Sequence, residues 1–115
     1  MQRGPYDRDM AADPLWEGFV AAMHTFGHAV ERRSRYGDKP ALALDGREIA
    51  HREAPGLIDL RITGAGWSQI KAQYAGDPAV HRDPSRRDWI EVRLSGPADL
   101  ERLGDLLATA MACNR

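Results

Sequence analysis

The spacing of apolar residues changes several times along the 115-residue chain, and each change predicts a new element. The first apolar residues have a helical period and would share one helix face: Leu15, Phe19, Ala22, Met23 and Phe26. Asp13 and Pro14 suit the N-cap and the first helical position, and Gly27 suits the end of the helix. Residues 1–12 show no pattern, which predicts a flexible tail ahead of a single domain over 13–115.

From Ala29 the period falls to two, which is typical of strands. Asp45-Gly46 is a strong signal for a two-residue hairpin turn, between strands over 41–45 and 47–52. Regular pairing outward from this turn gives Leu44 with Arg47, Leu42 with Ile49 and Pro40 with His51. This register predicts a buried face formed by Leu42, Leu44 and Ile49, with His51 at its end. It predicts the opposite face for Ala43, Glu48, Ala50 and Arg52.

Two later segments alternate strictly between apolar and polar residues. In 57–62 the apolar set is Ile58, Leu60 and Ile62, and the other side carries Leu57, Asp59 and Arg61. In 89–94 the core-facing set is Ile90, Val92 and Leu94, and the side facing away carries Trp89, Glu91 and Arg93. Between these strands we expect a short helix at about 65–75, ended by Gly76, and a polar loop over 77–87.

A leucine-rich stripe that begins after Pro97 predicts one last helix. The order is therefore a helix, a meander of strands, a helix, a strand and a helix. This order predicts the α+β class, as a two-layer sandwich of an antiparallel sheet with helices on one face.

Composition narrows the functional classes. Hydrophobic residues make up 43% and charged residues 29%, with a net charge of −1, which argues against nucleic-acid binding because such proteins usually carry a strong basic excess. Cys113 is the only cysteine, so an internal disulfide is excluded and a reducing compartment is favoured. The N-terminal residues lack the pattern of a secretory signal, and no apolar stretch approaches the ~20 residues of a membrane span. We therefore expect a cytoplasmic protein without membrane association.

Polar residues cluster in three of the later segments: GREIAH at 46–51, LIDLRI at 57–62 and HRDPSRRDWIEVRL at 81–94. Their order resembles the small bacterial and fungal family known as the luciferase domain family, over about 46–110. The matching residues are Arg47, Glu48, His51, Leu57, Asp59, Leu60, His81, Pro84 and Trp89. The chain departs from the family pattern at 86–88, where Arg-Arg-Asp replaces a shorter proline–aspartate–serine–glycine run. The resemblance implies a related fold and carries no specific reaction with it.

The candidate catalytic residues are His51, Asp59 and His81, because two imidazoles and a carboxylate can transfer protons near neutral pH. Arg86 and Arg87 are candidate ligand-binding residues because guanidinium groups bind phosphates and carboxylates. A third candidate is Trp89, whose ring could contact a flat ligand. The predicted register places His51 and Asp59 on opposite faces, which leaves open whether the three catalytic candidates share a site.

These residues predict a small-molecule-binding or processing domain with a polar cleft near the 81–89 loop. As an enzyme it would use cofactor-free acid–base chemistry, because the sequence contains none of the usual nucleotide, serine-hydrolase or zinc motifs and we expect neither a cofactor nor a metal. The alternative is a non-catalytic protein-interaction module that forms a homodimer or docks a partner. The sequence does not decide whether the protein is an enzyme.

Overall fold

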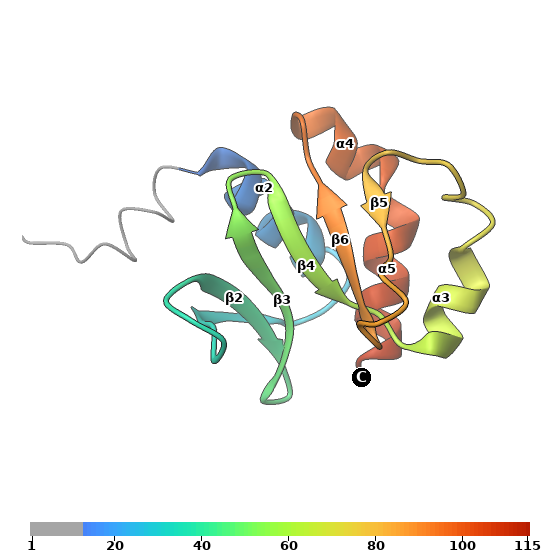
Figure 1. Cartoon of the computed structure of the whole chain (residues 1–115). Coiled ribbons are helices and arrows are strands. Elements are labelled where there is room, and N and C mark those ends of the chain that lie inside the picture. Colours follow the sequence, from blue (N-terminus) through green and yellow to red (C-terminus); the bar gives the residue numbers. More distant parts are fainter. Residues whose placement is uncertain (1–12) are drawn as a thin grey trace, which may run out of the picture.

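The computed structural model describes residues 13–115, which form an antiparallel sheet and four helices (Figure 1). The strands are β1 (Val30–Arg33), β2 (Pro40–Leu44), β3 (Arg47–Ala54), β4 (Leu57–Arg61), β5 (Val80–His81) and β6 (Trp89–Arg93). They lie in the order β1-β2-β3-β4-β6-β5. The predicted α+β class is confirmed, whereas the tail predicted at 1–12 lies outside the described residues.

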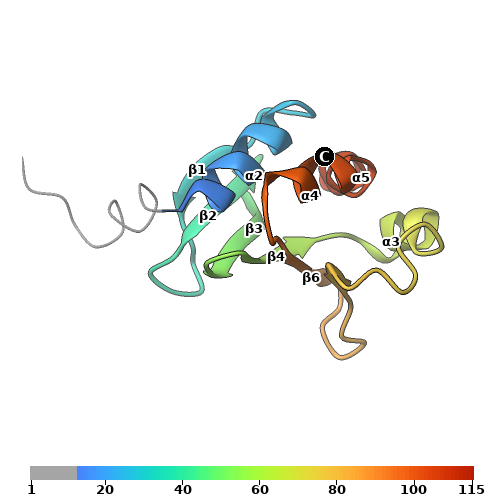
Figure 2. The same cartoon turned by 90° about the horizontal axis from the view of Figure 1, so that it is seen from above.

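The helices are α2 (Pro14–His24), α3 (Gly64–Ile70), α4 (Pro97–Arg102) and α5 (Gly104–Cys113). Figure 2 shows α2, α4 and α5 over one face of the sheet, and α3 packs beside α5. The core between the layers contains Trp16, Phe19, Ile58, Leu60, Leu106 and Leu107, all fully buried. We refer to the opposite face of the sheet as the open face. No helix within 13–115 is long and apolar enough to cross a membrane.

The start of α2 agrees with the sequence prediction, because the Asp13 side chain accepts hydrogen bonds from the backbone of Leu15 and Trp16 at 3.1 and 3.2 Å. The prediction of one last helix is wrong. The segment after Pro97 is divided into α4 and α5 at Leu103, whose backbone leaves helical geometry (φ −92°, ψ 13°) while its side chain is buried in the core. The glycine that follows has a low helix propensity and starts the second segment.

Strands β4 and β6 pair in the regular register that their alternation predicts. Ile58 lies opposite Val92 and Leu60 lies opposite Ile90, and all four side chains are buried under the helices. Beyond β6, part of the predicted 77–87 loop is strand β5, which that prediction missed. A two-residue strand has too few residues to show a period.

Strand β3 is irregular, and the predicted register fails there. The hairpin turn itself is confirmed, because Asp45 and Gly46 have φ angles of 53° and 82°. Beyond the turn, a β-bulge leaves Ile49 as an extra residue; the observed pairs are Ala43 with Glu48, Leu42 with Ala50 and Ala41 with His51. The predicted pairs Leu42–Ile49 and Pro40–His51 are therefore wrong, and Ala50 is fully buried in the core rather than on the opposite face.

Candidate functional site

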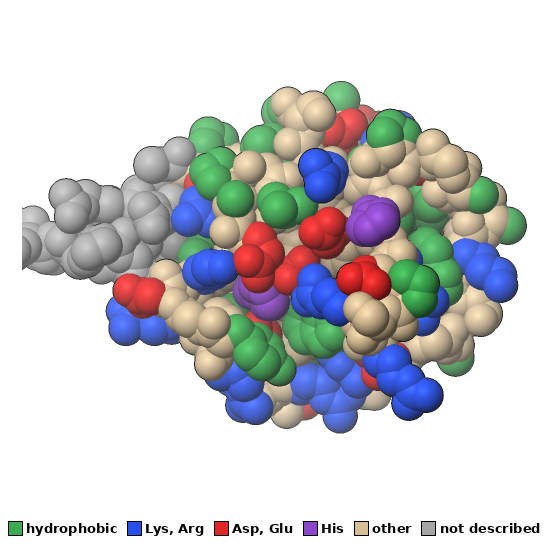
Figure 3. All heavy atoms as spheres, in the orientation of Figure 1, with side chains coloured by type: hydrophobic (Ala, Val, Ile, Leu, Met, Phe, Trp, Pro, Cys, Tyr) green, Lys and Arg blue, Asp and Glu red, His purple; other side chains and the backbone are tan. Residues whose placement is uncertain are grey.

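A row of polar residues crosses the open face from strand to strand. His51 on β3 pairs with Asp59 on β4, Asp59 pairs with Glu91 on β6, and Glu91 pairs with His81 on β5. Directly paired residues project from the same face of a sheet. The expectation that His51 and Asp59 face opposite ways is therefore wrong, because the bulge at Ile49 changes the face of Ala50, His51 and Arg52. Figure 3 shows acidic and basic side chains gathered over the strands on this face.

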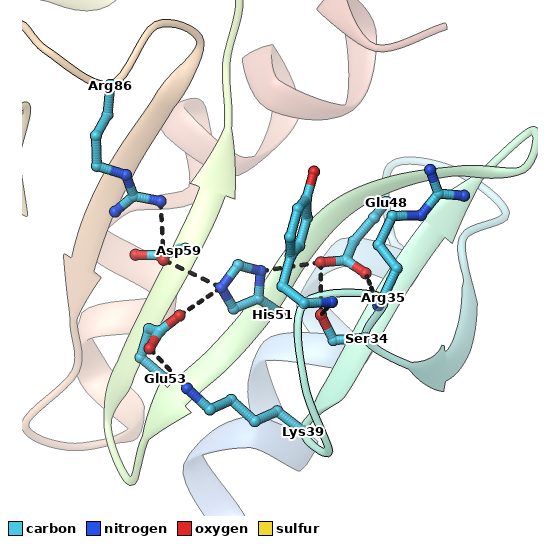
Figure 4. A network of polar contacts seen from close by, with 9 residues as sticks. Ser34, Arg35, Lys39, Glu48, His51, Glu53, Asp59 and Arg86 are labelled. Atoms are coloured by element: carbon cyan, nitrogen blue, oxygen red, sulfur yellow. Dashed lines mark hydrogen bonds and ion pairs between the residues drawn. The ribbon is translucent and has the colours of Figure 1, made fainter.

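The imidazole of His51 lies among three carboxylates (Figure 4). Its Nδ1 is 3.0 Å from Glu48 Oε2, while Nε2 is 2.6 Å from Glu53 Oε1 and 3.1 Å from Asp59 Oδ2. Only 6% of the His51 side chain is exposed, and Glu48 and Asp59 are equally well buried. An imidazole with acceptors at both nitrogens is held in a fixed orientation, and both nitrogens can donate when the ring is protonated.

The carboxylate of Glu48 connects this histidine to the loop after β1. The hydroxyl of Ser34 donates to Glu48 Oε2 at 2.9 Å, and the backbone N–H of Arg35 donates to Oε1 at 3.0 Å. Glu48 is a buried carboxylate with donors at both oxygens, so its burial is compensated.

Two basic side chains balance the remaining carboxylates. Lys39 Nζ lies 2.8 Å from Glu53 Oε2, and Arg86 donates to Asp59 Oδ2 at 3.0 Å. With His51 protonated, the three carboxylates face three positive charges. The cluster is then close to neutral, which makes the buried carboxylates tolerable.

The pKa values follow from this environment. Burial acts to lower the pKa of His51, but contacts with Asp59 and Glu53 outweigh burial and raise it above its ordinary value of 6.5. Burial acts to raise the pKa of Asp59, yet the hydrogen bonds from His51 and Arg86 lower it to about 2. The contact between the two groups therefore favours the protonated form of His51 and the ionised form of Asp59.

The cluster opens onto a cavity of about 480 Å³, which we term the central cavity. Its lining includes Tyr36, His51, Glu53, Asp59, Arg86 and Trp89. The Trp89 and His51 ring centroids are 5.6 Å apart, and the Tyr36 ring lies 5.8 Å from His51. One end of the cavity is thus ionic and the other is aromatic.

Two of the predicted site residues, His81 and Arg87, do not line the central cavity. His81 is exposed at the far end of the polar row, three strand spacings of about 4.8 Å from His51, so the two imidazoles cannot act on one atom. His81 borders a recess of about 70 Å³ together with Asp83, Arg86, Trp89 and Glu91, and this recess adjoins the central cavity. Arg87 is exposed and lines neither the recess nor the central cavity.

A metal ion is a second use that the geometry allows. The ligand atoms of His51, Glu53 and Asp59 lie within 4.8 Å of one another, and nitrogen and carboxylate oxygen suit divalent cations. Asp59 Oδ1 is buried and has no hydrogen-bond partner within 13–115, so this oxygen is available to a cation. The positive charges of Lys39 and Arg86 oppose an additional cation, however, and they already balance the carboxylates.

Sequence reasoning missed Glu48, Glu53, Lys39 and Tyr36 as site residues. Glu53 lies two positions after His51, and strand alternation could have placed both on one face. Glu48 is three positions before His51, and only the bulge brings the two side chains to the same face. Lys39 and Tyr36 lie in the turn between β1 and β2, and the periodicity of the sequence does not predict where this turn lies relative to β3.

Comparison of the chain with protein-family models, with curated proteins and with solved structures finds no match. The resemblance to the luciferase domain family therefore stays a prediction.

Proposed function

We propose that the central cavity binds a small, partly planar molecule and that His51 exchanges a proton with it. The observation that carries the proposal is the position of the His51 ring. It is buried, fixed by carboxylates at both nitrogens, and placed at the wall of a cavity beside Trp89. Buried titratable groups at the wall of a cavity are typical of functional sites.

Proton transfer would take place at Nε2, the nitrogen that contacts Glu53 and Asp59. The Nε2–H bond of the imidazolium breaks, a bond from that hydrogen to a basic atom of the ligand forms, and the positive charge leaves the ring. Glu53 is the partner that can move aside, because 34% of its side chain is exposed against 3% for Asp59. Asp59 and Glu48 would then keep the ring in place, and the neutral ring can take a proton back.

Ligand binding would depend on the aromatic end of the cavity. Trp89 lies on β6 at the edge of the open face and is partly exposed, so that a flat ligand can cover its ring. A volume of about 480 Å³ falls within the range of small-molecule sites. The alternative, a protein-interaction module, gains less support. The large hydrophobic side chains exposed in the described part of the chain are Val30 and Tyr36, too few for an apolar docking patch.

The first test is a titration of His51 by NMR, which follows the imidazole signals against pH. We expect a midpoint above 6.5, and a lower midpoint in Glu53→Gln because one neighbouring negative charge is lost. A midpoint below 6.5 would contradict the raised pKa of His51. Adding Mn²⁺ or Zn²⁺ to the same sample tests the competing use. Stoichiometric, tight binding that blocks the His51 titration would establish a metal site and overturn the proton-transfer proposal.

The second test is a screen of small planar compounds by amide chemical shifts. Hits should shift the signals of His51, Asp59 and Trp89 together. Trp89→Ala should abolish binding of the hits, whereas Trp89→Phe, which keeps a ring in the cavity, should retain most of it. Compounds that bind Trp89→Ala as well as the unchanged protein would show that the central cavity is not the binding site.

A further inference from the structure

A second cavity lies on the other side of the two aromatic residues that line the central cavity. It measures about 410 Å³, and Tyr36 and Trp89 line both cavities. Its remaining lining includes Arg35, Arg47 and Arg61, and we term it the arginine cavity. The Tyr36 and Trp89 rings, whose centroids are 6.4 Å apart, stand between an acidic, histidine-containing cavity and a basic one. A ligand that reaches both cavities passes over these two rings.

The three arginines come from three separate segments. Arg47 follows the Asp45-Gly46 turn at the start of β3, and Arg35 lies in the loop after β1. Arg61 ends β4 and pairs with Trp89 on β6, so both project from the open face. The same face carries basic side chains below its acidic centre in Figure 3.

Two of these guanidinium groups have no partner among residues 13–115. Arg35 and Arg47 are exposed, and neither side chain forms an ion pair or a hydrogen bond there. Arg61 instead donates to Asn114 at 2.5 Å and lies 3.4 Å from Asp88. The buried carboxylate of the cavity, Glu48, is already occupied by Ser34, the Arg35 backbone and His51. Asp45 also lines this cavity, so its three arginines face two carboxylates and one positive charge is in excess.

The distance between the two cavities follows from the strand. Asp59, which contacts His51, and Arg61 are two residues apart on the same face of β4, or about 7 Å along the strand. A planar molecule of one or two rings covers that distance. The side chain that would lie between its two ends is Trp89.

We propose that the ligand of this protein carries an oxyanion group, phosphate or carboxylate, that binds in the arginine cavity while its planar part lies against Trp89 and reaches His51. The inference rests on the proposed function of the central cavity and names the class of molecule that it accepts. Guanidinium groups donate two parallel hydrogen bonds to such anions, and the unpaired donors of Arg35 and Arg47 are free to do so. The anion fixes the ligand at one end and thereby positions the other end at His51.

The probes for the test are phenyl phosphate, benzoate, phenol and inorganic phosphate, each titrated into the full chain and followed by amide chemical shifts. We expect phenyl phosphate or benzoate to bind at least tenfold more tightly than phenol, and to shift signals of both cavities. Arg35→Gln and Arg47→Gln should each weaken the binding of the anionic ring compounds roughly tenfold, the usual effect of losing one charge-assisted contact. Phenol binding should not change.

The control is Arg93→Gln, which removes an exposed arginine of the same face outside both cavities. Equal weakening by this variant would mean that only overall charge matters, and would overturn the inference. Phenol that binds as tightly as phenyl phosphate and benzoate, with both arginine variants unaffected, would also overturn it while leaving the proposed function intact.

Two further outcomes separate the proposals. Inorganic phosphate that binds as tightly as phenyl phosphate, with shifts in the arginine cavity alone, would contradict a ligand that spans both cavities. If none of the ring compounds, charged or neutral, shifts the signals of Trp89 and His51, and the wider planar-compound screen is also negative, the proposed function fails and the inference fails with it.

Discussion

Strand pair β4–β6 and strand β3 lie side by side in one sheet, yet they follow different rules. The β4–β6 pair is regular over five residue pairs, and its alternation separates the core side chains from the open face cleanly. Strand β3 has two irregularities, one at Ile49, opposite Leu42 and Ala43 of β2, and one between Arg52 and Ala54. Between them lies His51, the centre of the polar cluster.

The regular pair β4–β6 stabilises the sheet, whereas the irregular strand β3 forms the polar cluster. The regular pair buries apolar side chains on one face and presents Asp59 and Glu91 on the other. The irregular strand adds residues that have no partner, and Glu48, His51 and Glu53 converge as a result. Bulges commonly reorient side chains next to functional sites in this way.

The largest expected effect concerns the regular pair. Val92→Asp places a charge without a partner in the fully buried core, so we expect the protein to be unfolded at 25 °C. Circular dichroism and thermal melting measure this. Arg93→Asp is the control, because the neighbouring side chain is 64% exposed on the opposite face, and it should cost less than about 1 kcal/mol. A Val92→Asp variant that melts like the unchanged protein would contradict the assignment of β6.

The next effect concerns the irregular strand. His51→Ala leaves two almost fully buried carboxylates, Glu48 and Asp59, without their shared partner. We expect a loss of about 3 kcal/mol in the free energy of unfolding, measured with urea. His81→Ala, in the same polar row but exposed, should change it by less than about 0.5 kcal/mol. Equal losses in the two variants would mean that the His51 contacts contribute little.

A smaller effect is expected at the turn that joins β2 to β3. Gly46 has a φ of 82°, and an added Cβ would meet no atom within 4 Å, so Gly46→Val tests backbone strain alone. We expect a loss of about 1 kcal/mol, because a β-branched residue resists positive φ. Gly96→Val offers equally open space with an extended φ of −175°, and it should cost less. A larger loss at Gly96 than at Gly46 would contradict this account of the turn.

The smallest effect is the pH dependence of stability, because titration changes one proton rather than a side chain. The pKa of His51 is raised in the folded state, so its contribution is complete below pH 6.5 and is lost as pH rises through the folded value. The pKa of Asp59 is lowered from 3.8 to about 2, so its contribution is present above 3.8 and is lost as pH falls toward 2. Both contributions are present between about pH 4 and 6.5.

Urea unfolding at several pH values tests this window. Stability should fall above pH 6.5 in the unchanged protein, and this fall should be weaker in His51→Gln, which does not titrate. An unchanged slope in that variant would assign the pH dependence to other groups.

The regular half of the molecule could be predicted from the sequence because strict alternation has one physical explanation. Ile90, Val92 and Leu94 are buried as expected, and the Asp45-Gly46 turn has the expected positive φ angles. The contact between His51 and Asp59 could not be predicted, because a single extra residue at Ile49 reverses the face of the next residues, His51 among them. Ile49 is apolar and fits the core whether or not a bulge forms, so the alternation contains no signal for it.

The sequence predicted several residues of the candidate site but not how they are arranged. His51, Asp59, Arg86 and Trp89 line one cavity, whereas His81 borders only the adjoining recess and Arg87 lines neither. Arg86 reaches Asp59 across 27 positions of sequence, a contact that the sequence of a polar loop does not reveal.

The two outer strands of the sheet differ from the four inner ones in a way that affects association between chains. Any open sheet has unpaired backbone N–H and C=O groups along its edges, and these can recruit a strand of another molecule. At one edge, β5 has only two residues, which offers too short a template. At the other edge, β1 places Glu31, Arg32 and Arg33 in succession, and an incoming strand would have to accommodate these charges. The sheet is thereby protected against edge-to-edge aggregation, even though none of the helices within 13–115 covers its open face.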